Sequence, residues 1–191
     1  YEKKVLQEVY KEYEAGRTPN PDILCNQYIK FGVWLKKATD LGFDYLATGH
    51  YANINNSRGT YNLTTAKDVK KDQTYFLHQL NQKQLAQTVF PIGGYTKTQV
   101  RALAKKFDLP TAKKEESMGI CFIGEVPMKE FLQPKVKSKI GSITVTSGEK
   151  IGKHDGLAFY TIGQRHHTGA KQQSQALYVV KKNLFTNTLV V

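Results

Sequence analysis

The spacing of hydrophobic residues changes near residue 126, and this change limits the folds open to the chain. Before it, apolar residues recur with the 3.6-residue period of amphipathic helices, as over 2–15 and 25–41. After it, short β-branched and aromatic runs alternate with Gly, Ser and Asn turns, and we expect strands in the runs 143–145, 157–162, 177–180 and 189–191. We therefore predict a boundary near Pro127, with an α/β domain over residues 1–126 and a small β-rich domain over 127–191.

The first region has the element order of a parallel α/β sheet. The two helical segments are followed by Asp44–Thr48, a short apolar run typical of a buried strand, which ends in Gly49-His50. Ligands of parallel sheets bind beyond the carboxyl ends of the strands, so Gly49 and His50 are expected at a site. Further on, a polar turn over 55–59 predicts a hairpin, and Thr96-Lys97-Thr98-Gln99 matches the capping box of a helix that stops at Leu109-Pro110.

The charge of the chain favours a polyanionic partner. The 191 residues carry 28 Lys and Arg against 16 Asp and Glu, a formal net charge of +12, and the whole excess follows residue 57. Lysines and arginines that neutralise phosphates release counterions and add affinity that does not depend on sequence, although charge alone leaves nucleic-acid binding open. No apolar run is long enough to span a membrane, and the first residues do not have the pattern of a signal peptide. We expect a cytoplasmic protein.

Two cysteines could carry chemistry. Cys25 follows the proline-stiffened, non-helical segment Arg17–Asp22 and begins the second predicted helix, where the positive end of the helix dipole would favour a thiolate. Cys121 lies in an apolar stretch between Gly119 and Gly124. Both also fit core positions, since cysteine is among the most buried residue types. The cysteine and histidine spacings match no metal-binding pattern, so no metal site is predicted.

Two polar segments have a functional and a structural interpretation. Asp22 stands three residues before Cys25 and could act as a general acid or base, or cap the helix. Lys71-Asp72-Gln73 could bind phosphate and sugar hydroxyls, or form the solvated start of a helix. The residues by themselves leave these alternatives open.

Five long strings give the chain a specific resemblance. They are GRTPNPDILCN (16–26), DYLATGHYA (44–52), KDQTYFL (71–77), GICFIGE (119–125) and GLAFYTIGQR (156–165). Their order and spacing resemble those of the tRNA-specific 2-thiouridylases. The resemblance implies an adenylating α/β domain of the PP-loop ATPase type. In this family ATP, with Mg²⁺ expected, adenylates the C2 oxygen of the wobble uridine, and a cysteine persulfide loaded by a donor protein displaces AMP.

The resemblance also assigns roles to residues. Cys121 resembles the persulfide-bearing cysteine and Cys25 its partner nucleophile, with a disulfide between them expected during turnover. Asn20-Pro21-Asp22 resembles the segment that holds the target base of the anticodon region, with Asp22 as acid or base. Gly49 resembles an ATP-contacting residue, and Lys71-Asp72-Gln73 a tRNA-contacting segment. A sulfur-relay protein or a cysteine desulfurase is the expected donor.

The chain departs from the family in three places, one of which is His166-His167-Thr168-Gly169-Ala170 in place of a more basic, Gly-rich run after the GQR. The Gly-rich SGGVDS-type loop that cradles the pyrophosphate has no counterpart in the chain, and neither has the C-terminal barrel. We therefore expect an internal fragment that hydrolyses ATP poorly on its own. A non-catalytic basic RNA-binding module, and an adenylating enzyme with another acceptor, are the alternative interpretations.

Overall fold

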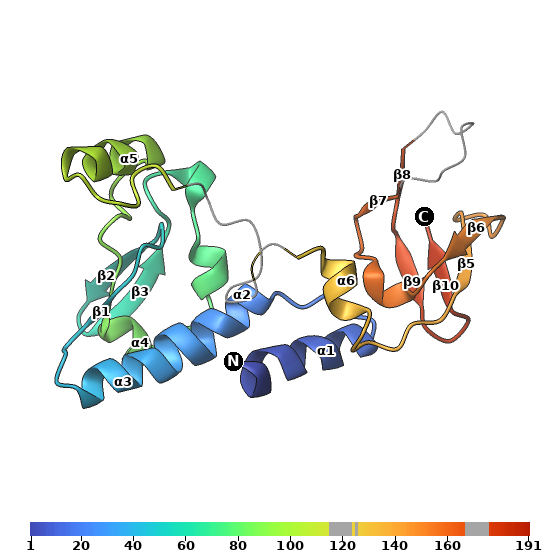
Figure 1. The fold of residues 1–191 in the computed structure, drawn as a ribbon, viewed down its shortest axis with the longest axis horizontal. Coiled ribbons are helices and arrows are strands. Elements are labelled where there is room, and N and C mark those ends of the chain that lie inside the picture. The colour runs from blue at the N-terminus through green and yellow to red at the C-terminus, as the bar shows by residue number, and fades with distance from the viewer. Residues whose placement is uncertain (115–123, 125, 167–175) are drawn as a thin grey trace. The chain divides into compact units, whose positions relative to one another are not determined.

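The computed structural model describes residues 1–114, 124, 126–166 and 176–191. The chain forms two compact units (Figure 1). The first contains residues 1, 3–5 and 21–124, and the second contains residues 2, 6–20 and 125–191. The expected Cys121 site and most of the string 119–125 lie outside the described residues.

A continuous helix opens the first unit. It consists of α2 (Pro21–Leu24), a π-helical stretch η2 (Cys25–Trp34) and α3 (Leu35–Asp40). The expected start at Cys25 is wrong by four residues, because Pro21 fits the first helical position, where its missing N–H is not needed. The helix ends as predicted. Gly42 adopts φ +86°, and the N–H of Phe43 bonds the Ala38 carbonyl in a Schellman motif.

The strands of the first unit are short. Strand β1 (Leu46–Ala47) pairs in parallel with β4 (Thr88–Val89), which confirms the parallel sheet. The expectation of a buried strand is wrong for the described residues, since Ala47 and Val89 are exposed. Buried parallel strands need both faces covered, and the described residues leave these faces largely open.

The predicted hairpin and the predicted capped helix are confirmed. Strands β2 (Asn53–Ser57) and β3 (Thr60–Thr64) join at Arg58-Gly59, a tighter turn than the expected 55–59. Both turn residues have positive φ, as a two-residue hairpin turn requires. Helix α5 (Lys97–Lys106) has its capping box at Thr96 and Gln99. The remaining elements of the unit are η3 (Val69–Lys71), η4 (Thr74–Leu77) and α4 (Gln82–Ala86).

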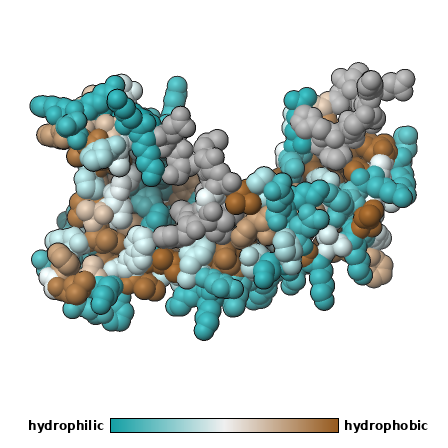
Figure 2. Space-filling model, in the orientation of Figure 1, coloured by the Kyte–Doolittle hydropathy of each residue, from teal (hydrophilic) through white to brown (hydrophobic). Residues whose placement is uncertain are grey.

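One hydrophobic cluster holds the first unit together. Phe31, Ala52, Leu77 and Phe90 are buried, and Leu46, Ile54, Leu63 and Leu80 pack around them. These residues come from η2, β1, the hairpin, η4 and the segment after β4, so the cluster joins most of the unit. Figure 2 shows hydrophobic side chains at the exposed end of α3, where Leu41, Phe43 and Tyr45 reach the surface.

The second unit is built on a mixed four-stranded sheet in the order β6-β5-β10-β9. Strand β10 pairs in parallel with β5 and antiparallel with β9. Ile143, Leu157, Val179, Leu189 and Val191 form its core. This unit includes α1 (Gln7–Glu14) and the C-terminal end of η1 (Glu2–Leu6). Its other elements are α6 (Met128–Leu132), β5 (Gly141–Thr144), β6 (Lys150–His154), η5 (Leu157–Phe159), β7 (Arg165–His166), β8 (Leu177–Tyr178), β9 (Lys181–Asn183) and β10 (Thr188–Val190).

The predicted strand over 157–162 is wrong, because Leu157–Phe159 forms a 3₁₀ turn. Gly156, at φ +147°, reverses the chain there, and its N–H donates to Nδ1 of the buried His154 (3.1 Å). Since Nδ1 accepts, Nε2 of His154 carries the proton and donates to the Asn187 carbonyl (3.1 Å). His154 is thus a structural residue of this unit.

Gly16 ends α1 as predicted, and its substitution tests the packing of the second unit. It has φ +74°, and a Cβ added there would lie 2.7 Å from Cδ2 of Leu184. Replacing Gly16 by Ala should lower the free energy of unfolding by roughly 1 to 2 kcal/mol, measured by urea titration. Gly94 is the control, since it has open space around it and no positive φ. Equal losses at the two glycines would contradict this account of Gly16.

Candidate functional site

Asp22 and Cys25 lie on the same helix in the first unit. Asp22 is the second residue of α2, inside the first turn, so the helix-cap interpretation is not what the structure shows. A carboxylate in the first turn interacts favourably with the helix dipole. Cys25 comes three positions after Asp22, which places both side chains on neighbouring positions of one helix face. The division between the two units falls between Asn20 and Pro21.

Cys25 is fully buried, with 0% of its surface exposed. The expected placement at the helix start is wrong, because the first turn is formed by Pro21–Leu24. The effect of the dipole falls off within that turn, so it gives no special reactivity to a thiol at Cys25. The pairing of Cys25 with Cys121 stays a prediction.

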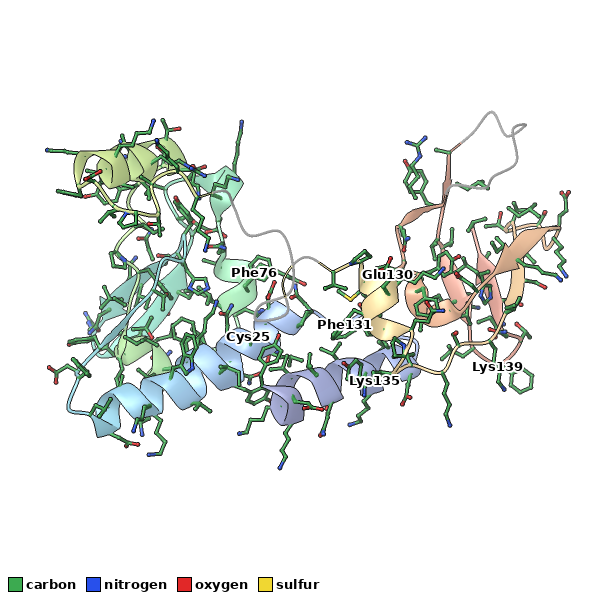
Figure 3. The ribbon with its side chains drawn as sticks, viewed as in Figure 1. Cys25, Phe76, Glu130, Phe131, Lys135 and Lys139 are labelled. Carbon is green, nitrogen blue, oxygen red and sulfur yellow. The ribbon has the colours of Figure 1, made fainter. Side chains whose placement is uncertain are left out.

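Asn26 connects this helix to the segment that carries Phe76. Its side chain is 2% exposed, and its Nδ2 donates to the Phe76 carbonyl (3.0 Å). Figure 3 shows Cys25 and Phe76 on these two neighbouring elements, and α2 and η2 both contact η4. The Oδ1 atom of Asn26 is buried without a hydrogen-bond donor. Asn26 closes the GRTPNPDILCN string, and its bond to a carbonyl 50 positions away could not be predicted from that string.

Gly49 and His50 follow β1, at the carboxyl end of a parallel strand, as predicted. Gly49 is exposed, and a Cβ added there would meet no atom within 4 Å. This open backbone fits the close approach of a nucleotide. A glycine-rich loop for the phosphates does not occur in the described ranges. The role of Gly49 in binding a nucleotide stays a prediction.

His50 is buried in the core and uncharged at neutral pH. Its ring lies 5.8 Å from that of Phe31 and 5.9 Å from that of Phe90, and its Nδ1 bonds the Thr48 hydroxyl (2.8 Å). Burial, and to a smaller extent the positive charge of Lys30, lower the pKa of His50 to about 4. His50 is therefore a core residue that shapes the loop after β1.

The Lys71–Gln73 segment is tied to that loop. The N–H of Gln73 donates to the Tyr51 carbonyl (2.8 Å), and Oε1 of Gln73 accepts from the Tyr51 N–H (3.0 Å). Two hydrogen bonds to one backbone residue fix both position and orientation. The structure thereby brings the segment beside Gly49 and His50, which stand 21 or more positions earlier in the chain.

Asp72 closes a turn within this segment. Oδ1 accepts from the N–H of Ala66 (2.7 Å), and Oδ2 accepts from the hydroxyl (2.5 Å) and the N–H (3.2 Å) of Thr74. Partial burial by itself would raise the pKa of Asp72, but these hydrogen bonds to the carboxylate outweigh it and lower the pKa. The expected helix start at this segment is replaced by the short turns η3 and η4.

Comparison with known proteins gives a consistent result over the chain. Residues 1–125 match the family model described as "tRNA methyl transferase HUP domain", and residues 129–191 match the "tRNA methyl transferase PRC-barrel domain". Proteins named tRNA-specific 2-thiouridylase MnmA from Bacillus velezensis, Ralstonia nicotianae and Halalkalibacterium halodurans are 50%, 48% and 48% identical to it, each over 100% of this chain. The chain belongs to the tRNA-specific 2-thiouridylase family.

Membership in the 2-thiouridylase family confirms the predicted fold class, an α/β domain of the PP-loop ATPase type followed by a small β-rich domain. The chain spans about half the length of these relatives, 52% of the one from Bacillus velezensis. Of the described helices, none has the length and apolar character to cross a membrane. The described residues also contain no group of three or more His, Cys, Asp or Glu side chains that could hold a metal ion.

The stability of this chain should depend on pH through His50. Below pH 6.5 the unfolded chain takes up a proton at this residue, whereas the folded chain does so only near the folded pKa of about 4. The contribution of His50 to the free energy of unfolding is fully present above pH 6.5. It should fall by about 3 kcal/mol between pH 6.5 and 4. Urea titrations of the protein and of a His50→Phe variant over this range measure the difference.

The exposed His78 provides the control for this measurement. A His78→Gln variant should keep the pH profile of the unsubstituted protein, whereas His50→Phe should flatten it. If His50→Phe left the slope unchanged, the charge state of His50 would not be coupled to folding.

Asn26 should stabilise the contact between its helix and η4. An Asn26→Ala variant loses the amide that bonds the Phe76 carbonyl, and we expect about 1 kcal/mol less stability in urea titrations. Asn62→Ala is the control, because that exposed side chain makes only a 3.5 Å contact with the Thr60 carbonyl. A loss no greater than that of the control would remove Asn26 from this role.

Proposed function

We propose that the protein to which this chain belongs transfers sulfur to C2 of the wobble uridine of tRNA. The observation that carries the proposal is the near-50% identity, over all 191 residues, to proteins named tRNA-specific 2-thiouridylase. The three described site strings, at residues 16–26, 44–52 and 71–77, lie within the unit that the HUP model covers or at its border. We assign residues 1–126 to the adenylating domain and 127–191 to the small β-rich domain.

The proposed chemistry has two stages. The C2 oxygen of the uridine attacks the α-phosphate of ATP, a substrate expected with Mg²⁺. Pyrophosphate leaves, and the adenylated C2 oxygen becomes a leaving group. The outer sulfur of a persulfide on Cys121 then attacks C2, and AMP leaves with the oxygen. Cys25 attacks the sulfur that remains on Cys121, which releases the 2-thiouridine thiolate and leaves a Cys25–Cys121 disulfide. An external thiol must reduce this disulfide before the next turnover.

The residues of this chain position the reactants. Asn20-Pro21-Asp22 holds the target base, because prolines stiffen the entry to the helix and leave Asp22 in its first turn. Asp22 transfers a proton to or from the base. Gly49 gives the nucleotide close access at the end of β1. A base that reacts in such a pocket must leave the anticodon stack.

The partners follow from this chemistry. They are the anticodon region of a tRNA, contacted by Lys71-Asp72-Gln73, and a sulfur-relay protein or cysteine desulfurase that loads Cys121. A cytoplasmic location is proposed for the same reason, since tRNA and ATP are both available there. In this proposal Asp72 and Gln73 support the contact by shaping the segment, given that both side chains bond within the unit.

The full burial of Cys25 favours one alternative, a basic RNA-binding module whose cysteines only fill the core. An adenylating enzyme with another acceptor is the remaining alternative. The family-model descriptions name methyl transfer, while the relatives' names state thiolation. Nucleoside mass spectrometry separates these outcomes, because sulfur replacing oxygen and an added methyl group change the mass differently.

Substitution of the two cysteines tests the proposal. In the full-length protein, Cys121→Ser and Cys25→Ser should each abolish 2-thiouridine formation, and Asp22→Asn should lower it at least tenfold through loss of acid–base catalysis. The assay is mass spectrometry of nucleosides from tRNA incubated with ATP and a sulfur donor. Because Cys25 is buried, its substitution can also destabilise the protein. Urea titrations of the Cys25→Ser and Cys25→Ala variants show whether an inactive variant has lost only the thiol or has also lost the fold.

Two outcomes contradict this mechanism. Full activity in both cysteine variants would exclude the two-cysteine route. A full-length protein that binds tRNA tightly but forms no 2-thiouridine under these conditions would favour the binding module.

A further inference from the structure

The lysines near the proposed tRNA-contacting segment extend beyond that segment. Residues 66–114 carry ten basic and three acidic side chains. Lys67 and Lys70 are exposed, and Lys71 and Lys97 are half-buried. The ion pairs within the described ranges do not include Lys67 or Lys70. Figure 2 shows hydrophilic side chains over α5, the helix that begins with Lys97.

Backbone contacts hold the first of these lysines in place. The N–H of Lys67 donates to the Gly93 carbonyl (2.9 Å). Gly93 itself packs so closely that an added Cβ would lie 1.9 Å from the Ala52 carbonyl oxygen. Lys67 is therefore presented from a segment that is fixed against the start of the hairpin.

Asp68 holds the backbone of two further lysines, Lys71 and Lys97. Oδ2 of Asp68 accepts from the N–H of Lys97 (2.9 Å), and the Asp68 carbonyl accepts from the N–H of Lys71 (2.9 Å). The ammonium group of Lys97 lies 5.6 Å from the centre of the Tyr51 ring, the residue that Gln73 bonds twice. Asp68 thus joins η3 to the start of α5, and Tyr51 joins both to the loop after Gly49.

We propose that Lys67, Lys70 and Lys97 form, together with Lys71, a surface that binds the phosphate backbone of the tRNA. Asp68, Asp72 and Gln73 are positioning residues that keep this lysine surface in shape. The inference rests on the proposed function for the identity of the RNA. Its own basis is charge: lysines act as point charges toward phosphates, and contacts of this kind orient the nucleic acid without reading its sequence.

An RNA backbone suits the lysine surface better than an acidic protein segment or a single nucleotide. The four lysines come from a loop, a 3₁₀ turn and the first turn of a helix, so they offer separate cations over a stretch of surface. A polynucleotide presents phosphates at regular intervals, which suits separate cations on several elements. The flanking exposed side chains Val69 and Tyr95 add apolar contact area for sugars and bases.

Salt-dependent tRNA binding tests the lysine surface. The full-length protein and the variants Lys67→Ala, Lys70→Ala and Lys97→Ala are titrated with unmodified tRNA transcript at several salt concentrations. Each substitution should reduce the slope of log affinity against log salt by about 0.7 to 0.9, and the triple variant by about 2. Affinity at a fixed moderate salt concentration should fall several-fold for each variant.

Three controls make the lysine-surface result specific. Lys37→Ala removes an exposed lysine on α3, which lies at the other end of the first unit from α5 (Figure 1), and should leave the slope unchanged. Lys97→Arg keeps the charge and its contact with Tyr51, and should restore binding. ATP affinity should be equal in all variants, and a parallel loss of ATP binding would show that these lysines serve the nucleotide instead.

The outcomes for the lysine surface and for thiolation are separable. A triple variant with an unchanged salt slope overturns the lysine surface, even if the protein makes 2-thiouridine. A protein that makes no 2-thiouridine but binds tRNA with the expected lysine-dependent slope supports the lysine surface and overturns the thiolation proposal.

Discussion

The burial of a neutral imidazole at His50 is the constraint on which the first unit depends. The His50 ring packs against Phe31 of η2 and Phe90 after β4, so one contact joins the loop that follows β1 to two distant parts of the chain. A charged ring could not be buried there without a large desolvation cost, and the Thr48 hydroxyl satisfies the polar Nδ1. Ala52 and Leu77 complete the same cluster, which brings the hairpin and η4 onto it. The segments that carry Gly49, Cys25 and Gln73 are thus anchored to one core.

Hydrogen bonds then set the order of these segments around the core. Asn26 holds the helix of Cys25 to η4, and Gln73 holds the beginning of the same η4 region to Tyr51. Each bond joins a side-chain amide to backbone, so it fixes a direction as well as a distance. A sulfur transfer that needs a nucleotide, a base and a thiol in one place depends on such fixed directions, since small displacements reduce rates sharply. The polar contacts are therefore as important to the proposed site as the residues expected to react.

Local chemistry explains which predictions hold. Glycines and capping residues act within one turn, and so Gly16, Gly42 and the Thr96 capping box were predictable from their neighbours alone. Pro21 was assigned to a non-helical loop because two prolines close together suggest extended chain, yet a proline also fits the first helical turn. The burial of a strand could not be predicted from its neighbouring residues. Asp44–Thr48 has the composition of a buried strand, but whether Ala47 is covered depends on elements far away in sequence. The contact between Asn26 and Phe76 spans 50 residues and has no local signal.

In the Lys71–Gln73 segment, the residues that mark the family differ in part from those that could contact RNA. The string KDQ marks the family because its sequence is unusual, and two of its three side chains bond inward, to Ala66, Thr74 and Tyr51. Inward bonding of this kind makes a residue hard to replace without requiring that it touch a substrate. The lysines beside the string, in contrast, follow no fixed pattern in the sequence, and their charge can act from several backbone positions. A surface that binds a flexible polyanion can therefore vary in its cations while the scaffold beneath it stays constant, so the proposed contacts to RNA include the lysines around the string as well as Lys71 within it.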